Sequence, residues 1–290
     1  MDEDSSIRKV GQLERERERE RDRDRDRDRD RDRDRVELAE MGPDAFARSL
    51  GSVASYPMRE GHDLPPLVGP MSTVTEQYRT IKARIEYLSR STGKTIRTLV
   101  ITSAGSGDGK TLTALNLALV LAQDDNKSVL MVDADLRKPG IRDYFQHRPK
   151  VGLIEVLGKE VGLNSVLFRP EKSRLMILPS GARATNPAEL LGSRRMEHMV
   201  QDLAKRFDHV VIDTPPVGLF IDADVLGAFA DACLVVVRAG KSPKRLVQQT
   251  VETMKKHNLI GLVLNDVRQT PFERYYEYDR YYYYRNRGGK

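Results

Sequence analysis

A glycine-rich segment, LVITSAGSGDGKT at residues 99–111, constrains the fold more than any other part of the chain. The apolar residues 99–101 predict a buried strand, residues 103–109 form a loop of small residues, and residues 112–123 predict an amphipathic helix. Glycines allow backbone N–H groups to turn toward a phosphate, and the N-terminus of the following helix adds partial positive charge. This order of strand, loop and helix is typical of a phosphate-binding loop.

The last residues of the loop carry the expected chemistry. Lys110 would reach the β- and γ-phosphates of a nucleotide, and the Thr111 hydroxyl would bind Mg²⁺. The pattern differs from G-x-x-x-x-G-K-[ST] at one position, where Ala104 replaces the first glycine. The alternative is a glycine-rich turn with no ligand, which the acidic strand ends described next disfavour.

Polar residues follow three further predicted strands. Asp133 and Asp135 come after a strand at 128–132, Asp213 after a strand at 209–212, and Asn265 after a strand at 259–264. Alternation of strands with helices predicts an α/β fold with a parallel sheet covered by helices on both faces. Because ligands bind beyond the carboxyl ends of such strands, these residues are expected to meet beside the loop. The simpler alternative is that the aspartates cap helices. Further strands are predicted at 175–178 and 233–237, and a further helix at 193–207.

Composition limits the remaining possibilities. The 290 residues allow one or two domains, and the one cysteine, Cys233, lies in an apolar run that predicts a buried core thiol. No disulfide within the chain is possible, and no apolar stretch approaches the roughly 18 residues that span a membrane. The N-terminus also lacks the apolar core of a signal peptide. We therefore expect a cytoplasmic protein, for which any association with a membrane must come through a partner.

The N-terminal region reads as an extension. In residues 14–35, eleven acidic residues alternate with eleven arginines, so the tract is neutral and has no apolar face to bury. Its neutrality also makes it a poor arm for binding nucleic acid. Residues 36–73 read as a linker, which predicts a disordered extension over 1–73, a catalytic domain over 74–270 and a tail over 271–290.

The predicted domain begins with a helix and ends before a tyrosine-rich tail. From Val74, apolar residues recur at spacings of four and three, whereas Glu76, Arg79 and Lys82 lie on another face. Seven of the eleven tyrosines fall in the last 16 residues, after the last core strand, which predicts an exposed tail. These tyrosines are Tyr275, Tyr276, Tyr278, Tyr281, Tyr282, Tyr283 and Tyr284.

Taken together, the segments SAGSGDGKT, VLMVDADLRKP, NPAELLGS, VVIDTPP and VLN resemble the bacterial protein-tyrosine kinases of exopolysaccharide and capsule assembly, the BY-kinases. The resemblance covers about residues 70–290. That family and the MinD/ParA ATPases share a P-loop fold that carries a deviant Walker motif. Those ATPases carry a signature lysine five positions before the P-loop lysine, and Gly105 occupies that position here. The difference favours the kinase branch.

The resemblance implies roles for the matching residues. Asp133 would accept the tyrosyl proton, Asp135 and Asp213 would hold Mg²⁺ together with Thr111, and Asn265 would lie near the adenine of ATP. Lys110, Asp133, Asp135 and Asp213 would form the catalytic set. The family's phosphate loop is acidic or carries a proline; Asp108 fits, and the proline is absent. The nucleotide would also contact the loop and the first helical turn, at Gly105, Ser106, Gly107, Asp108, Gly109, Lys110, Thr111 and Leu112.

The resemblance also implies partners. The family's E-x-x-R-x-x-R motif, used for ring-like self-association, appears as Glu76, Arg79 and Lys82, and the lysine weakens any bidentate contact. The chain resembles the kinases that are separate from their transmembrane polysaccharide co-polymerase, and a cognate phosphotyrosine phosphatase is expected. The implied function is autophosphorylation of the tail by a neighbouring subunit, which regulates polysaccharide polymerisation and export.

Two other functions stay open at this point. A MinD/ParA-like ATPase switch without kinase activity would share the loop and the strand ends. A nucleic-acid-associated protein would use the arginine-rich tract at residues 14–35. Gly105 and the seven tail tyrosines favour the kinase over the first alternative, and the neutrality of the tract disfavours the second.

Overall fold

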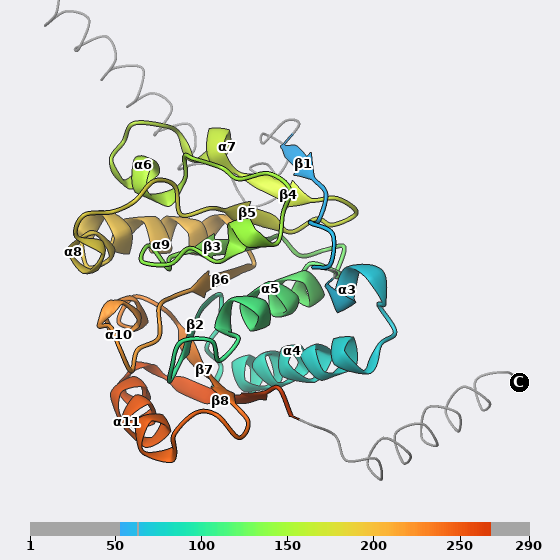
Figure 1. Ribbon diagram of the computed structural model, residues 1–290, viewed down its shortest axis with the longest axis vertical. Coiled ribbons are helices and arrows are strands. Elements are labelled where there is room, and N and C mark those ends of the chain that lie inside the picture. Colours follow the sequence, from blue (N-terminus) through green and yellow to red (C-terminus); the bar gives the residue numbers. More distant parts are fainter. Residues whose placement is uncertain (1–52, 63, 268–290) are drawn as a thin grey trace, which may run out of the picture. The chain divides into compact units, whose positions relative to one another are not determined.

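The computed structural model describes residues 53–62 and 64–267, and these contain an eight-stranded sheet in the order β1-β4-β5-β3-β6-β2-β7-β8 (Figure 1). Six of the seven strand pairs in this sheet are parallel, as expected. The exception is β4, which pairs in parallel with β1 but runs antiparallel to β5. The strands are β1 (Ala54–Tyr56), β2 (Thr98–Ser103), β3 (Val129–Asp133), β4 (Phe168–Pro170), β5 (Met176–Leu178), β6 (His209–Asp213), β7 (Ala232–Arg238) and β8 (Leu259–Asn265).

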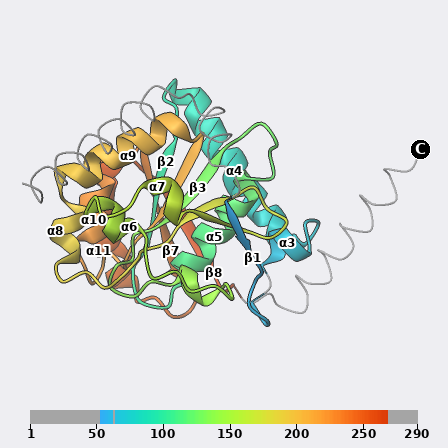
Figure 2. The ribbon, with the colours of Figure 1, turned by 90° about the horizontal axis from the view of Figure 1, so that it is seen from above.

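Helices cover both faces of this sheet. Figure 2 shows α4 and α5 on one side and α8, α9 and α10 on the other. On the first side α5 packs against β2, β3 and β6 and is covered by α4; on the second, α9 packs on β6, α10 on β2 and α11 on β7. The helices are α3 (Pro65–Val68), α4 (Thr73–Thr92), α5 (Lys110–Leu121), α6 (Leu153–Leu157), α7 (Leu163–Val166), α8 (Pro187–Leu191), α9 (Arg194–Arg206), α10 (Asp222–Gly227) and α11 (Lys244–Met254), with 3₁₀ turns at Ile141–Asp143 and Lys255–His257.

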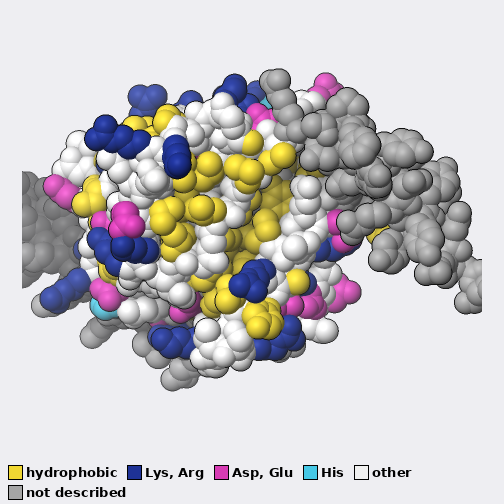
Figure 3. Space-filling model, turned by 90° about the horizontal axis from the view of Figure 1, so that it is seen from below, with side chains coloured by type: hydrophobic (Ala, Val, Ile, Leu, Met, Phe, Trp, Pro, Cys, Tyr) yellow, Lys and Arg dark blue, Asp and Glu magenta, His cyan; other side chains and the backbone are white. Residues whose placement is uncertain are grey.

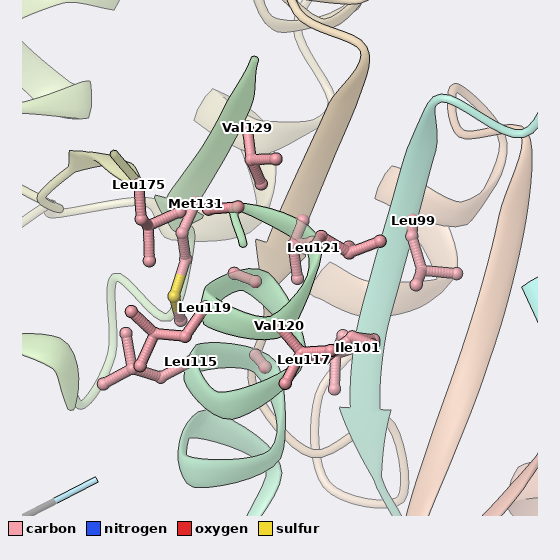
Figure 4. Packing of buried hydrophobic residues seen from close by; sticks show 14 of the residues in the cluster. Leu99, Ile101, Leu115, Leu117, Leu119, Val120, Leu121, Val129, Met131 and Leu175 are labelled. Atoms are coloured by element: carbon pink, nitrogen blue, oxygen red, sulfur yellow. The ribbon is translucent and has the colours of Figure 1, made fainter. Parts of the chain in front are cut away.

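The core is centred on α5. All its residues from Thr113 to Leu121 are buried, because the helix lies between the sheet and α4 and therefore needs apolar side chains on every face. Figure 4 shows Leu115 and Leu119 directed toward Met131 of β3, and Leu117 close to Ile101 of β2. This packing fixes the start of α5, and with it the phosphate loop, against the central strands. Cys233 is fully buried in β7, as expected, and burial raises the pKa of its thiol to about 12.

The folded domain begins before Val74, so the predicted linker over residues 36–73 is wrong in its C-terminal part. β1 pairs with β4, Leu64 is buried, and the ring of Tyr56 stacks on His147 with 3.9 Å between centroids. Because a three-residue strand and a four-residue helix are too short to show a periodicity, neither element could be predicted from the sequence. The arginine-rich tract and the tail tyrosines lie outside the described residues, so their predictions stay untested.

The first long helix, α4, has clear boundaries. The Ser72 hydroxyl accepts a hydrogen bond from the Thr75 N–H at 3.2 Å and caps its start, and Gly93 ends it in the left-handed conformation. Tyr78 and Ile85 are buried as predicted, whereas Val74 is 43% exposed at the helix end.

β8 lies at one end of the sheet and presents part of its surface to solvent. Leu262 and Leu264 are exposed on it. Figure 3 shows hydrophobic side chains gathered on the underside of the molecule, where β8 lies in Figure 1. In the part of the chain that the structure describes, none of the helices combines the length and the apolar character that crossing a membrane requires.

Candidate active site

The phosphate loop occupies residues 104–109, between the end of β2 at Ser103 and the start of α5 at Lys110. Gly107 and Gly109 have φ values of +80° and +93°, a left-handed conformation that glycine adopts without strain. A Cβ atom on Gly109 would lie 2.0 Å from Nδ2 of Asn265, so any other residue there would both strain the backbone and displace the Asn265 side chain. The predicted order of strand, loop and helix is therefore confirmed.

Four predicted site residues meet where α5 begins. Nζ of Lys110 lies 2.7 Å from Oδ2 of Asp135 and 3.5 Å from Oδ1 of Asp213. The Thr111 hydroxyl donates a 2.6 Å hydrogen bond to Oδ2 of Asp213. Asp213 is completely buried and the side chain of Lys110 is 11% exposed, so these charges interact with little screening by water.

Asp133 lies beside this group but faces a different set of partners. It pairs in register with Asp213 across β3 and β6. Its two carboxylate oxygens accept hydrogen bonds from the N–H groups of Asp135 and Ile141, both at 3.3 Å. Asp133 is 1% exposed, so the loop that follows β3 covers the residue expected to accept a proton.

Burial and like charges perturb the titration of this cluster. Burial raises the pKa of Asp213 to about 6, although Lys110 and the Thr111 hydrogen bond pull it down. Burial and the nearby charge of Asp213 also hold the pKa of Asp133 well above its usual range. For Lys110, burial alone would lower the pKa, but attraction to Asp213 and Asp135 outweighs it and the net pKa is raised. Carboxyl groups poised this way are typical of functional sites.

Asn265 and Asp108 are brought to the same place by different elements. Nδ2 of Asn265, at the end of β8, donates a 2.9 Å hydrogen bond to the backbone oxygen of Asp108. The Asp108 carboxylate turns into the protein and accepts hydrogen bonds from the Gly105 N–H and the Ser242 hydroxyl. Asn265 is thus next to the phosphate loop, as expected, and the Asp108 carboxylate is engaged within the protein.

Some residues that shape the site were not predicted. The Arg137 Nε lies 3.0 and 3.2 Å from the carboxylate oxygens of Asp222, which is fully buried at the start of α10. The guanidinium also lies over the ring of Phe220, 4.2 Å from its centroid. Gly218 packs so closely on the start of the phosphate loop that a Cβ atom would lie 2.2 Å from the backbone oxygen of Ala104. Arg137 and Asp222 are 85 residues apart, so no local pattern in the sequence indicated that they pair.

The remaining predicted residues lie on α4. Glu76 and Arg79 form an ion pair, Arg79 also donates to Gln123 at 3.1 Å, and Lys82 lies 4.0 Å from Asp124. Arg79 and Lys82 line a surface hollow of about 440 Å³ between α4 and the end of α5. The seven tail tyrosines lie outside the described residues.

The donors present fit a magnesium ion bound together with a nucleotide. Among the described residues, no three His, Cys, Asp or Glu side chains form a cage that would hold a metal on its own. Thr111 and Asp213 instead offer a hydroxyl and a carboxylate 2.6 Å apart. Magnesium prefers oxygen ligands and commonly takes one or two from the protein and others from substrate phosphates and water.

This fold, with its glycine-rich loop between β2 and α5, is that of a P-loop enzyme, a class whose fold implies nucleotide binding. Comparison with known proteins gives the family. Residues 96–260 match the family model described as an AAA domain. The chain is 38% identical to the tyrosine-protein kinase YwqD of Bacillus subtilis over 198 residues, which cover 68% of this chain and 82% of that protein.

Two further proteins are similar to the chain. The kinase domain of the Escherichia coli tyrosine kinase ETK superposes with a TM-score of 0.64 at 27% identity, covering 72% of this chain and 83% of that one. The succinoglycan biosynthesis transport protein ExoP of Rhizobium meliloti is 31% identical over 76% of this chain, which corresponds to 28% of ExoP. The chain belongs to the bacterial tyrosine-protein kinases, which confirms the resemblance seen in the sequence. Membership favours the kinase over an ATPase switch without kinase activity.

Proposed function

We propose that this kinase uses ATP and Mg²⁺ to phosphorylate the tyrosines of its own tail, Tyr275, Tyr276, Tyr278, Tyr281, Tyr282, Tyr283 and Tyr284. The observation that carries the proposal is the convergence of Lys110, Thr111, Asp135 and Asp213 at the first turn of α5. This arrangement offers a cation for phosphates, oxygens for a metal and carboxylates for a substrate proton. A tail rich in tyrosine follows the last strand of the same sheet.

The nucleotide would occupy the phosphate loop and replace the internal ion pairs of Lys110. That side chain now contacts Asp135 and Asp213, and it would turn its charge to the β- and γ-phosphates. Thr111 and Asp213, with Asp135 nearby, would hold Mg²⁺, which supplies positive charge to the phosphate oxygens when bound. Asn265 would lie near the adenine, as the resemblance to the family implies, and its contacts with Gly109 and the Asp108 backbone put it beside the loop.

The phosphoryl transfer needs a proton acceptor. A tyrosine hydroxyl oxygen attacks the γ-phosphorus, its proton passes to a carboxylate, and ADP leaves with the electrons of the broken P–O bond. Asp133 is the proposed acceptor and Asp135 supports it. Asp133 must be ionised to accept a proton. Burial and the charge of Asp213, which raise its pKa, oppose ionisation, whereas the positive charge of Lys110 favours it.

A neighbouring subunit is the proposed source of the tyrosine. From Asn265 to Tyr281 the chain has 16 residues, which in extended form reach roughly 50 Å. Glu76, Arg79 and Lys82 would contribute to the contact between subunits in a ring. The hollow beside Arg79 and Lys82 supports this placement, because a partner side chain could exchange for their weak internal pairs.

The relatives suggest where this activity is used. ExoP is named as a succinoglycan biosynthesis transport protein, and the chain matches only part of its length. By analogy, the kinase would regulate exopolysaccharide or capsule polymerisation and export. A transmembrane co-polymerase would recruit the kinase to the inner face of the membrane. A cognate phosphotyrosine phosphatase would reverse the phosphorylation.

Mapping phosphotyrosine by mass spectrometry after incubation with ATP and Mg²⁺ tests the proposal. The parent protein should carry phosphate on tail tyrosines, and Lys110→Met should carry none. Mixing full-length Lys110→Met with an active protein lacking residues 271–290 tests transfer between subunits, since the only tail present belongs to the inactive chain. A phosphorylated tail in the mixture supports transfer in trans, and an unmodified tail contradicts it.

A further inference from the structure

The phosphate loop is held from outside by a hydrogen-bond network that includes Arg238, the last residue of β7, and Ser242 of the β7–α11 connection. The Ser242 hydroxyl donates a 2.9 Å hydrogen bond to Oδ1 of Asp108, and Oδ2 of Asp108 accepts one from the Gly105 N–H at 2.8 Å. The Arg238 N–H donates to the Ser242 oxygen at 2.8 Å. These contacts form a continuous chain of hydrogen bonds from the end of β7 to the first residues of the loop.

We propose that Ser242 is a positioning residue of the nucleotide site, acting through Asp108. The inference rests on the proposed binding of a nucleotide at the phosphate loop. Ser242 holds the Asp108 carboxylate against the Gly105 N–H, and this contact closes the loop on itself across three residues. The curve that the loop must keep around a phosphate is then already set before the nucleotide arrives, so less ordering is needed on binding.

Burial and charge explain why this position needs a partner. Asp108 is 5% exposed, and the described structure gives its carboxylate hydrogen bonds to a hydroxyl and a backbone N–H. A buried carboxylate without such donors is costly. If the Ser242 hydroxyl is removed, the Asp108 carboxylate loses one donor and is freer to turn toward the phosphates, which it would repel. Ser242 therefore both shapes the loop and keeps a negative charge away from the ligand.

Arg238 supplies a second connection to the same loop. Its Nη1 donates to the backbone oxygen of Gly107 at 3.2 Å, and its Nε donates to Asp266 at 2.8 Å. The arginine therefore holds the loop at a position next to Asp108 while its backbone N–H positions Ser242. Ser242 is chosen for the test because its side chain can be changed without altering any charge.

Calorimetric titration of the full-length protein with ADP in the presence of Mg²⁺ tests the inference, together with KM for ATP. Ser242→Ala should weaken ADP binding roughly tenfold, as expected for one hydrogen bond to a carboxylate, and should raise KM more than it lowers kcat. Ser242→Thr keeps the hydroxyl and should bind within about twofold of the parent. Ser165→Ala is the matched control, because that hydroxyl is exposed and bonds only to Gly162 of its own turn among the described contacts.

A double variant separates positioning from general stability. If Ser242 acts through Asp108, then Ser242→Ala should add no further loss to Asp108→Ala. Parent-like ADP binding by Ser242→Ala, equal losses in Ser242→Ala and Ser242→Thr, or additive losses in the double variant would each overturn the inference. Should Ser242→Ala fail to fold by circular dichroism, Asp108→Ala alone carries the test, and parent-like binding there overturns it.

Lys110→Met distinguishes this inference from the function on which it rests. Loss of ADP binding in Lys110→Met with normal binding in Ser242→Ala would reject the positioning role alone. Normal ADP binding in Lys110→Met would reject the nucleotide site itself.

Discussion

The Thr111 hydroxyl and the Asp213 carboxylate, 102 residues apart in the sequence, are joined by a 2.6 Å hydrogen bond. One belongs to the first turn of α5 and the other to the end of β6. Because β6 lies between β3 and β2 in the sheet, Asp213 stands between the phosphate loop and the second acidic strand end. The two oxygens of the proposed magnesium site are thus already adjacent, and the carboxylates around them are expected to differ in role.

The first prediction separates Asp133 from Asp213. Asp133→Asn should abolish most tyrosine phosphorylation, because the substitution removes the proposed proton acceptor. It should leave ATP affinity within about threefold, because the Asp133 side chain bonds to the loop after β3. Asp213→Asn should also reduce the dependence of ATP affinity on Mg²⁺. Calorimetry with and without Mg²⁺ measures both effects, and equal, large losses of affinity in the two variants would refute this division.

The second prediction concerns stability and pH in the absence of nucleotide. The pKa of Asp213 is raised to about 6 in the folded protein, above the roughly 3.8–3.9 of an unfolded chain. The folded state therefore binds the proton more tightly, and this contribution to the free energy of unfolding is fully present below pH 4 and is lost as pH rises through 6. In Asp213→Asn the side chain does not titrate, so its contribution to the free energy of unfolding does not fall as pH rises.

Asp213→Asn should consequently be more stable than the parent by about 1–3 kcal/mol at pH 7.5, and the difference should shrink at pH 5.0. Urea unfolding at pH 7.5, 6.0 and 5.0 measures the difference. A gap between the two proteins that is constant over this range would show that Asp213 does not titrate there.

The third prediction concerns the ion pair between Arg137, whose side chain is 30% exposed, and the fully buried Asp222. Arg137→Met leaves a fully buried carboxylate without its cation, and should lower the free energy of unfolding by about 1–3 kcal/mol. Arg174→Met is the matched control, since its pair with Asp125 is exposed on both sides and should change stability by less than about 0.5 kcal/mol. Chemical denaturation at neutral pH measures the free energy of unfolding of both variants. Equal losses would show that burial of Asp222 does not make its ion pair more important for stability.

The fourth prediction concerns control by the tail. Each phosphate adds about −1.5 to −2 charges, so several modified tyrosines per chain should repel one another where tails converge in a ring. The unmodified protein should associate and the phosphorylated protein should dissociate, as measured by sedimentation before and after treatment with ATP and Mg²⁺.

A variant with all seven tail tyrosines changed to Phe provides the control for that experiment. It binds nucleotide but cannot be modified on the tail, so it should stay associated in the presence of ATP and Mg²⁺. Dissociation equal to that of the parent would show that tail phosphorylation is not the switch.

Much of the fold was predictable because its strong elements have strong local patterns. β2, β3, β6, β7 and β8 consist largely of apolar residues; the ends of β3, β6, β7 and β8 were predicted within one residue, and those of β2 within two. The rule that ligands bind at the carboxyl edge of parallel strands then placed Asp133, Asp213 and Asn265 together, and the structure brings them to the same edge of the sheet. Both predictions, of the strands and of their common edge, depend only on the course of the backbone and not on contacts between side chains.

The rest depended on contacts that a linear pattern does not contain. β1 is three residues long and is fixed by pairing with β4, which runs antiparallel to β5. The bonds between Arg137 and Asp222 and between Ser242 and Asp108 join side chains 85 and 134 residues apart. Such pairs are set by tertiary packing, so their partners could not be chosen from spacing alone.

The position of β8 at the end of the sheet has a consequence for how the site comes apart. Asp133 and Asp213 stand on neighbouring inner strands, which are protected on both sides, whereas Asn265 stands on a strand with one open edge. Local opening in native proteins begins where few neighbours hold the backbone. Amide hydrogens of β8 should therefore exchange with solvent sooner than those of β3 and β6. Fraying of that one strand would release Asn265 from the backbone of Asp108 while the carboxylates keep their places, and a nucleotide bound as proposed would then have an exit that leaves the acidic centre intact.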